Sequence, residues 1–358
     1  MKRETLSVLD LPDRWASIDR QGMRGVLESI PSQVRSAVEI ADQISVSNPG
    51  KIGNIVVSGL GGSAIGGDVV SAAVGELLRV PLIVNRDYGL PAFVGPGSLV
   101  IACSYSGNTE ETLDAFAQAR RLRAAVFCIT SGGRLAELAQ EQKVPLVLIP
   151  GGLQPRAALG FSSIALLGAL RAFGLLPDLT GPFQETVQLL TSLVDRYHPD
   201  VPEANNRAKA LARSLHGRIV VIYGSTGVVS GATVRWRGQL EENAKNLAFH
   251  HLLPEMNHNE LVGWEYPKDS LKRLGVIFLR DKGDHPQIQR RFECTRELIA
   301  TRAGVAHEVW TEGESRLARI FSVMCLADFV SLYLAYLNEV DPTPVEAIEA
   351  LKRKLRLY

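Results

Sequence analysis

The sequence has little of several features that mark particular protein classes. Its 358 residues include four cysteines, which are scattered and form no CxxC pair: Cys103, Cys128, Cys294 and Cys325. Isolated thiols of this kind are typical of a reducing compartment, so we expect a cytoplasmic location. Net charge is near +1, with 39 basic and 38 acidic residues. No broad electrostatic field is therefore available to attract nucleic acid or an anionic membrane.

Long uninterrupted apolar runs are also missing. The first residues include Glu4 and Asp10 and contain no apolar stretch of signal-peptide length. The most apolar window, residues 321–337, carries Asp328 and tyrosines, so we expect no membrane span. What remains is a chain that is 46% hydrophobic and 22% charged, a composition typical of a globular protein. Its length allows two domains of ordinary size.

Apolar runs that read as strands alternate with helical patterns along the chain. After a helical region at residues 12–47, such runs occur at residues 52–57, 80–84, 99–103, 124–129 and 144–149. A second alternating set begins at residue 218, with strands expected at residues 219–223, 274–279 and 308–310. This alternation predicts parallel strands joined by crossover helices. We divide the chain into residues 1–153, a helical arm with a first α/β domain, and residues 154–358, a second α/β domain with a helical tail.

A cluster of hydroxyl side chains stands where an expected strand gives way to an expected helix. Four of the six residues 104–109 carry one, namely Ser104, Tyr105, Ser106 and Thr109. Backbone N–H groups and the helix dipole make such a junction an anion site, and Gly107 allows close backbone approach. The pattern favours a phosphate monoester. The alternative is a polar turn capped at Asn108 or Thr109.

A glycine-rich loop follows the preceding expected strand, at residues 58–68. Its glycines allow positive φ angles, and Ser63 adds a hydroxyl at the mouth of the next helix. Gly59-x-Gly61-x-x-Ala64 also matches the dinucleotide fingerprint, so a nicotinamide-dependent dehydrogenase is an alternative. The acidic residue expected about 20 residues further on is poorly matched, because Asp87 lies farther away.

The two loops together resemble the sugar isomerase (SIS) fold, and more narrowly the bifunctional phosphoglucose/phosphomannose isomerases. Further matching segments stand in that family's order, at residues 130–135, 155–159, 242–245, 253–259, 343–344 and 350–353. The resemblance implies an α/β fold with two SIS-type doubly wound domains, whose parallel sheets are flanked by helices. It also implies metal-independent isomerisation of glucose 6-phosphate and mannose 6-phosphate to fructose 6-phosphate. No cofactor or metal is implied, and the partner is a second copy that shares its active sites.

The resemblance also assigns the phosphate to the two loops. The residues expected to bind it are Gly62, Ser63, Ser104, Ser106 and Thr109. The second half has the acids Asp281 and Asp284 at the matching position and no hydroxyl, so we expect one phosphate site per subunit.

Four residues are expected to carry the catalysis, three by proton transfer and one by its charge. Glu242 faces away from an apolar helix stripe and is the expected base between C1 and C2; Glu241 beside it either raises the pKa of Glu242 or lies outside the site. Arg156, permanently charged, suits an enediolate, and His258 titrates near neutrality and suits ring opening. Only the resemblance assigns Lys352 to ring opening, and only it implies that His258 serves the neighbouring subunit. The alternative for each residue is an ordinary surface side chain.

Thr343 is assigned by the resemblance alone as the specificity residue. In the family, a Thr at this position leaves room for rotation about C2–C3, so that mannose 6-phosphate is accepted. The alternative is a helix cap or a turn before Pro344.

Two further hypotheses compete with a metal-free isomerase. His250, His251, Glu255 and His258 could suggest a metal, but Pro254 prevents them from sharing one helix face. A non-catalytic sugar-phosphate sensor would need only the phosphate loops and would leave Glu242 unexplained.

Overall fold

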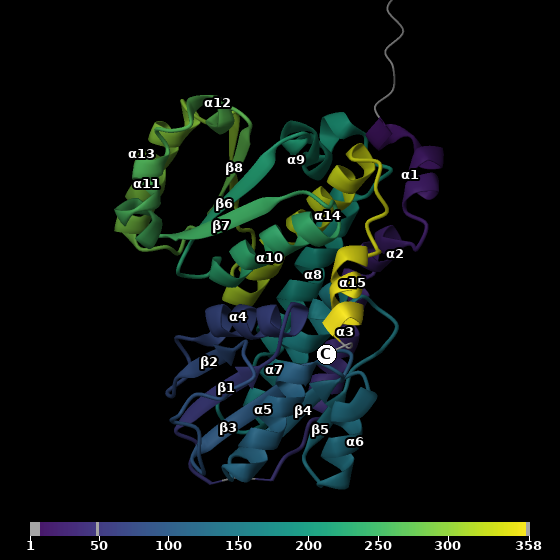
Figure 1. Cartoon of the computed structure of the whole chain (residues 1–358), viewed down its shortest axis with the longest axis vertical. Coiled ribbons are helices and arrows are strands. Elements are labelled where there is room, and N and C mark those ends of the chain that lie inside the picture. Colours follow the sequence, from purple (N-terminus) through teal and green to yellow (C-terminus); the bar gives the residue numbers. More distant parts are fainter. Residues whose placement is uncertain (1–7, 48–49, 356–358) are drawn as a thin grey trace, which may run out of the picture. The chain divides into compact units, whose positions relative to one another are not determined.

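The computed structural model describes residues 8–47 and 50–355. By internal contacts, the chain divides into two compact units (Figure 1). The first unit comprises residues 29–190 and 313–320, and the second comprises the rest of the described residues. The expected boundary after residue 153 rests on the sequence pattern, and it stays a prediction.

The first unit is built on a five-stranded parallel sheet with strand order β2-β1-β3-β4-β5. Its strands are β1 (Asn54–Ser58), β2 (Leu82–Asn85), β3 (Ser98–Ser104), β4 (Ala125–Thr130) and β5 (Leu146–Leu148). Its helices are α3 (Ile30–Asp42), α4 (Gly62–Val74), α5 (Glu110–Arg121), α6 (Gly133–Glu141), the 3-10 turn η2 (Pro155–Ala158) and α7 (Leu159–Ala172). Right-handed crossovers place α4 on one face of the sheet and α5 and α6 on the other.

The core of this unit explains why the apolar runs become strands. Every residue of β3 is buried, and its Val100 packs with Phe116 of α5 and Leu135 of α6. A strand covered on both faces has no polar side to present, which is why it reads as a continuous apolar run. Burial of such side chains contributes roughly 1.5–3 kcal/mol each.

The second unit has a four-stranded parallel sheet with order β7-β6-β8-β9. Its strands are β6 (Ile219–Ser225), β7 (Ala248–Leu253), β8 (Leu274–Arg280) and β9 (Val305–Trp310). Its helices and 3-10 turns are η1 (Val8–Asp10), α1 (Pro12–Ile18), α2 (Met23–Glu28), η3 (Glu203–Asn205), α9 (Arg207–Leu215), α10 (Ser230–Glu242), η4 (Glu255–His258), α11 (Glu260–Gly263), α12 (Lys268–Leu271), α13 (Pro286–Ala300) and α15 (Glu346–Leu355). Helices α8 (Thr180–Tyr197) and α14 (Arg316–Leu337) contribute residues to both units.

The two parallel sheets with flanking helices confirm the predicted fold class. Strand β7 is the main element that the sequence did not predict. It is an edge strand with an exposed Phe249 followed by two histidines, so it shows neither a continuous apolar run nor a clear alternation.

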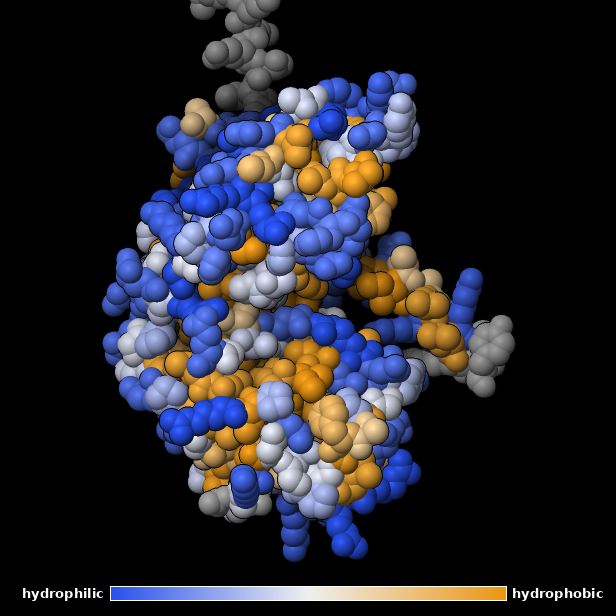
Figure 2. Space-filling model, turned by 90° about the vertical axis from the view of Figure 1, so that its left-hand side faces the viewer, coloured by the Kyte–Doolittle hydropathy of each residue, from blue (hydrophilic) through white to orange (hydrophobic). Residues whose placement is uncertain are grey.

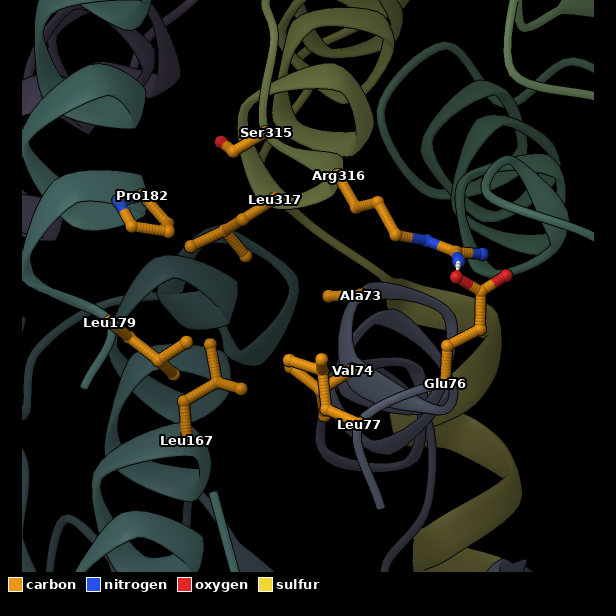
Figure 3. Close-up of a pocket in the computed structure, with 10 residues that line it drawn as sticks. All are labelled: Ala73, Val74, Glu76, Leu77, Leu167, Leu179, Pro182, Ser315, Arg316 and Leu317. Carbon is orange, nitrogen blue, oxygen red and sulfur yellow. Dashed lines mark ion pairs between the residues drawn. The ribbon is translucent and has the colours of Figure 1, made fainter. Parts of the chain in front are cut away.

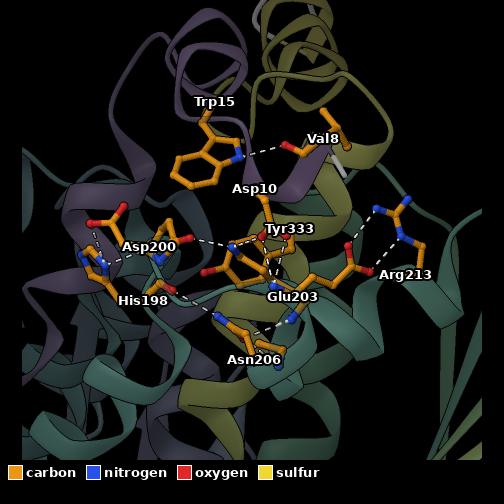
Figure 4. A network of polar contacts seen from close by, with 12 residues as sticks. Val8, Asp10, Trp15, His198, Asp200, Glu203, Asn206, Arg213 and Tyr333 are labelled. Carbon is orange, nitrogen blue, oxygen red and sulfur yellow. Dashed lines mark hydrogen bonds and ion pairs between the residues drawn. The ribbon is translucent and has the colours of Figure 1, made fainter. Parts of the chain in front are cut away.

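The N-terminal segment is anchored to the second unit by a polar network in which Asp10 accepts from the Glu203 N–H at 3.0 Å (Figure 4). Lys209 is fully buried, and its Nζ donates to Asp10 Oδ1 at 2.8 Å and to the Pro199 carbonyl at 2.5 Å. The same ammonium lies 5.1 Å from the centroid of the Trp15 ring. Since a buried charge is stable only when it is paired, this contact set ties residues 10–15 to α9.

Helix α14, which contains the apolar window 321–337, is long and apolar enough to cross a membrane by length and composition, although Asp328 and the tyrosines led us to expect no span there. Its apolar window is fully buried inside the protein, as in a core helix.

Large apolar side chains also reach the surface, and Figure 2 shows hydrophobic groups between hydrophilic ones on one face.

Candidate active site

Both predicted phosphate loops lie at the carboxyl ends of neighbouring strands in the first unit. Strands β1 and β3 pair in parallel, with Ser58 opposite Ala102. The loops after them touch, because the Tyr105 N–H donates to Ser63 Oγ at 3.3 Å. Ligands of open α/β sheets bind at this edge, beyond the carboxyl ends of the strands. The two motifs therefore form one structure, which we call the cup (residues 59–63 and 104–109).

The hydroxyls of the cup are held in defined positions. Ser104 Oγ and Thr109 Oγ1 lie 2.8 Å apart, and Ser104 is buried. Thr109 occupies the N-cap position of α5, but its side chain makes no capping hydrogen bond. Ser106 is exposed, and its Oγ accepts from the Asn108 N–H at 3.2 Å. A polar turn capped by its own hydroxyl therefore does not account for Thr109.

Glycine is required at two points where the cup backbone passes close to its neighbours. Gly107 has φ +69°, and a Cβ there would lie 1.8 Å from the Gly132 carbonyl oxygen. A Cβ at Gly62 would lie 2.8 Å from the Pro155 carbonyl oxygen and 3.4 Å from the Arg156 nitrogen. The second contact brings Arg156 beside the start of α4, and its side chain is buried. The structure thus places Arg156 next to the cup.

Tyr105 links the cup to the segment that leads into Arg156. Its hydroxyl donates to the Pro150 carbonyl and accepts from the Leu153 N–H, both at 3.0 Å. Burial raises the pKa of the Tyr105 hydroxyl, so the phenol stays protonated. The sequence analysis counted the Tyr105 hydroxyl among the groups of the anion site, whereas in the structure this hydroxyl binds two backbone groups of the segment before Arg156.

Glu242 ends helix α10 in the second unit, and that helix is firmly held. The Trp236 indole N–H donates to the Val323 carbonyl at 2.8 Å, and Arg235 forms a buried ion pair with Asp328 at 2.9 Å. The predicted apolar stripe is buried, whereas Glu242 is half-buried. The carboxylate therefore lies at the fixed end of a rigid element. Glu241 lies beside Arg237, at 3.5 Å, and burial raises the pKa of Glu241.

Lys245 brings the segment before Thr343 to the end of this helix. Its Nζ donates to the Glu242 carbonyl at 3.0 Å, to the Asp341 carbonyl at 2.7 Å and to the Pro342 carbonyl at 3.1 Å. Lys245 has φ +52°, which lets the chain turn back at this point. The backbone of Glu242 thus lies close to the segment that leads into Thr343. Lys245 lies in the matching segment 242–245, but the resemblance assigned it no role.

His258 and Lys352 both lie in exposed positions of the second unit. His258 ends the 3-10 turn η4, directly after β7, and Lys352 lies on α15. Helix α15 has no buried residue, and its apolar Ile348, Leu351 and Leu355 are 43%, 57% and 61% exposed. The predicted phosphate residues and Arg156 are in the first unit, whereas the remaining predicted site residues are in the second.

The loop of the second unit that matches the cup is occupied by one of the protein's own carboxyl groups. Ser225 Oγ donates to Asp284 Oδ1 at 2.8 Å, and a Cβ at Gly227 would lie 3.0 Å from that oxygen. Burial raises the pKa of Asp284, and nearby Asp281 adds to the shift. The Asp284 side chain therefore already fills the Ser225–Gly227 turn.

Two other features of the structure bear on ligand binding. Among the described residues, no group of three or more His, Cys, Asp or Glu side chains is arranged to hold a metal ion. The first unit also contains an apolar cavity of about 160 Å³, with the Glu76–Arg316 ion pair beside it (Figure 3). None of the predicted site residues lines that cavity.

Comparison with known proteins shows to which structural class this protein belongs. The model of the bacterial phospho-glucose isomerase C-terminal SIS domain matches residues 204–355. A crystal structure of a hypothetical protein from Thermus thermophilus shares the fold, with a TM-score of 0.74 and 16% identity over 96% of this chain and 92% of that one. The chain is therefore an SIS-type α/β protein.

Relatives with higher sequence identity show which family within this class the chain belongs to. A bifunctional phosphoglucose/phosphomannose isomerase of Caldicellulosiruptor bescii is 44% identical over 328 residues, which are 91% of this chain and 97% of the relative. One from Aquifex aeolicus is 35% identical over 85% of this chain and 91% of that relative. The chain belongs to the family of bifunctional phosphoglucose/phosphomannose isomerases, which confirms the resemblance.

Proposed function

We propose that this protein interconverts glucose 6-phosphate and mannose 6-phosphate with fructose 6-phosphate. The observation that carries the proposal is the Tyr105–Ser63 hydrogen bond, which joins two hydroxyl-bearing loops into one cup. A phosphate dianion in the cup would accept from these hydroxyls and from backbone N–H groups. Hydrogen bonds to a charged partner are worth roughly 1.5–3 kcal/mol each. Such an anchor holds the unreactive end of the sugar and positions C1 and C2.

The proposed reaction is a sequence of proton transfers. His258 and Lys352 move a proton between the C1 hydroxyl and the ring oxygen, which opens the ring. The Glu242 carboxylate then removes the C2 proton and returns it to C1, and the proton of the C2 hydroxyl passes to the C1 oxygen. Arg156 stabilises the negative charge of the cis-enediolate between these transfers. Electrons are redistributed within the sugar and none leaves it, so this chemistry requires no redox cofactor. Family membership and the rigid mounting of α10 support these roles.

Thr343 is proposed to set the acceptance of mannose 6-phosphate. Protonation of either face of C2 requires rotation about C2–C3 of the enediolate, which needs space beside the base. The Lys245 contacts, which bring the 341–343 segment to the end of α10, support a place for Thr343 beside Glu242. A small β-branched side chain leaves that space open.

We also propose that the protein acts as a homodimer in the cytoplasm and that His258 serves the site of the neighbouring subunit. Three large apolar side chains around the segment that carries His258 are exposed: Phe249 by 53%, Val262 by 73% and Tyr266 by 71%. An apolar surface around a polar catalytic group is typical of a contact region. The free thiols, three of them buried, support a reducing compartment.

The decisive assay incubates the chelator-treated protein with fructose 6-phosphate and separates glucose 6-phosphate from mannose 6-phosphate. Both products are expected. Glucose 6-phosphate alone would overturn the role of Thr343, and binding without turnover would favour the sugar-phosphate sensor.

A pair of variants tests the proposed base. Glu242→Gln should retain affinity for fructose 6-phosphate and lose turnover by about 10²–10⁴-fold, the usual contribution of a general base. Glu241→Gln is the matched control, because its carboxylate lies beside Arg237. Turnover by Glu242→Gln at the rate of the control would remove Glu242 from the mechanism.

A further inference from the structure

The turn that carries His258 is held in place by contacts of its N-terminal residues with the core of the second unit. Met256, two residues earlier, is fully buried and belongs to the same apolar cluster as Tyr223 and Trp264. Between them, the Asn257 amide donates to Thr295 Oγ1 at 2.8 Å. His258 itself is exposed. An exposed imidazole therefore stands on a backbone that is pinned on its N-terminal side.

On its C-terminal side, the turn is held by Glu260, and both carboxylate oxygens are engaged. The Tyr223 hydroxyl donates a short hydrogen bond to Glu260 Oε1, and His251 Nδ1 lies 2.6 Å from Glu260 Oε2. Tyr223 and His251 are directly opposite each other on the parallel strands β6 and β7. Glu260 thus bridges two neighbouring strands from a position two residues after His258.

The hydrogen-bond directions in this cluster are set by burial. The Tyr223 side chain is fully buried, and its hydroxyl accepts from the Trp264 indole N–H at 2.9 Å. Burial, reinforced by the adjacent Glu260 charge, raises the pKa of the Tyr223 hydroxyl far above its ordinary value. The phenol keeps its proton and donates it to Glu260. The carboxylate is therefore held in one orientation rather than free to rotate.

Asn259, which lies between His258 and Glu260, closes the turn. The Asn259 side chain accepts from the Glu260 N–H at 2.5 Å and donates to Glu255 Oε1 at 3.2 Å. Every residue from 256 to 260 except His258 has its side chain bound to a neighbouring element or to the turn itself.

We propose that Glu260 is a positioning residue for His258, with Tyr223 and His251 as its supports. This inference rests on the proposed role of His258 in ring opening. An acid–base group must lie within about 0.5 Å of its working position, and neighbouring side chains supply that accuracy. Glu260 supplies it by fixing the turn at the edge of the sheet, so that the exposed imidazole presents one geometry to the sugar.

The first measurement compares Glu260→Ala with wild type in the fructose 6-phosphate assay. A misplacement of about 1 Å can cost about 10²-fold, so we expect kcat to fall by about 10- to 100-fold. KM should change by less than about threefold, because the phosphate residues are untouched. Glu265→Ala, which removes an exposed carboxylate from the same segment, is the matched control and should keep wild-type kcat.

The second measurement separates positioning from a general structural role. The double variant Glu260→Ala/His258→Ala should have the same kcat as His258→Ala, because Glu260 then has nothing left to position. Equal factors in both backgrounds would overturn the positioning role and leave the proposed function intact. Wild-type kcat for His258→Ala would instead overturn the role of His258 and, with it, this inference.

A milder variant covers the case in which Glu260→Ala does not fold. Tyr223→Phe removes one hydroxyl and keeps the ring in the core, and we expect a smaller loss of kcat that also disappears in the His258→Ala background. A loss of kcat that persists in that background would contradict the inference.

Discussion

Substitution of Gly107 tests the structure of the cup, because this residue combines a left-handed backbone conformation with close packing. The residue has φ +69°, and a Cβ would lie 1.8 Å from the Gly132 carbonyl oxygen. Real Cβ atoms stay at least 3.0 Å from such an oxygen, so Gly107→Ala must move the two segments apart by about 1.2 Å. That carbonyl also accepts from Thr130 Oγ1 at 2.8 Å. The displacement therefore reaches the end of β4.

The magnitude follows from two terms. A left-handed conformation costs a non-glycine residue about 1–2 kcal/mol. Separation of the loops removes further hydrogen bonds, including that from the Leu135 N–H to the Gly107 carbonyl, each worth about 1 kcal/mol. We expect Gly107→Ala to lower the free energy of unfolding by about 2–4 kcal/mol. Loss of one phosphate hydrogen bond should weaken fructose 6-phosphate binding by about 10- to 150-fold.

Gly174→Ala is the control for backbone strain alone. Gly174 has φ +72°, and a Cβ there meets nothing within 4 Å. It should cost about 1 kcal/mol and leave ligand affinity unchanged. Chemical denaturation and calorimetric titration with fructose 6-phosphate measure the two quantities. Equal stability losses in the two variants, or unchanged affinity in Gly107→Ala, would refute the close-packed cup.

Three further substitutions test other parts of the structure. The raised pKa of Asp284 means that folding favours its protonated form. Its contribution to stability is present below about pH 4 and is lost as pH rises through the folded-state pKa. The stability of Asp284→Asn relative to wild type should therefore increase as pH rises above about 4 in urea titrations. Asp10→Ala removes the carboxylate partner of the buried Lys209 and should cost about 3 kcal/mol by denaturant unfolding, and an unchanged midpoint would show that the N-terminal anchor is dispensable. Ala73→Leu extends into the apolar cavity and should raise stability by about 1–2 kcal/mol, whereas Ala119→Leu in the filled core should lower it; thermal melts of the two distinguish them.

The sequence predicted the fold because its strands are buried on both faces. Strand β3 was located to within a residue at each end, since its apolar run stops where hydroxyl residues begin. The edge strand β7 was missed, because one of its faces is half-exposed and its histidines break the pattern. The α10 stripe at Trp236 and Leu240 was correctly placed toward the core.

The candidate site was only partly accessible from sequence. Loop contents identified the cup residues, because strand-to-helix junctions of neighbouring parallel strands meet at one edge. The contacts of Tyr105 with Pro150 and of Lys245 with Asp341 could not be predicted, since backbone carbonyls leave no trace in residue identity. Glu260 was likewise passed over, because its partners come from two other strands. The roles of the site residues stay predictions until the assays above are made.

The path of the chain through the two units limits how the protein can be dissected. From residue 8 the described chain lies in the second unit, enters the first after residue 28, leaves at residue 190, and returns once more for residues 313–320. That short return supplies Ser315 and Leu317 to the wall of the cavity beside α4. Truncation from either terminus would thus remove part of one unit without releasing the other whole. To isolate the first unit, residues 313–320 would have to be joined to the 29–190 fragment through a designed linker.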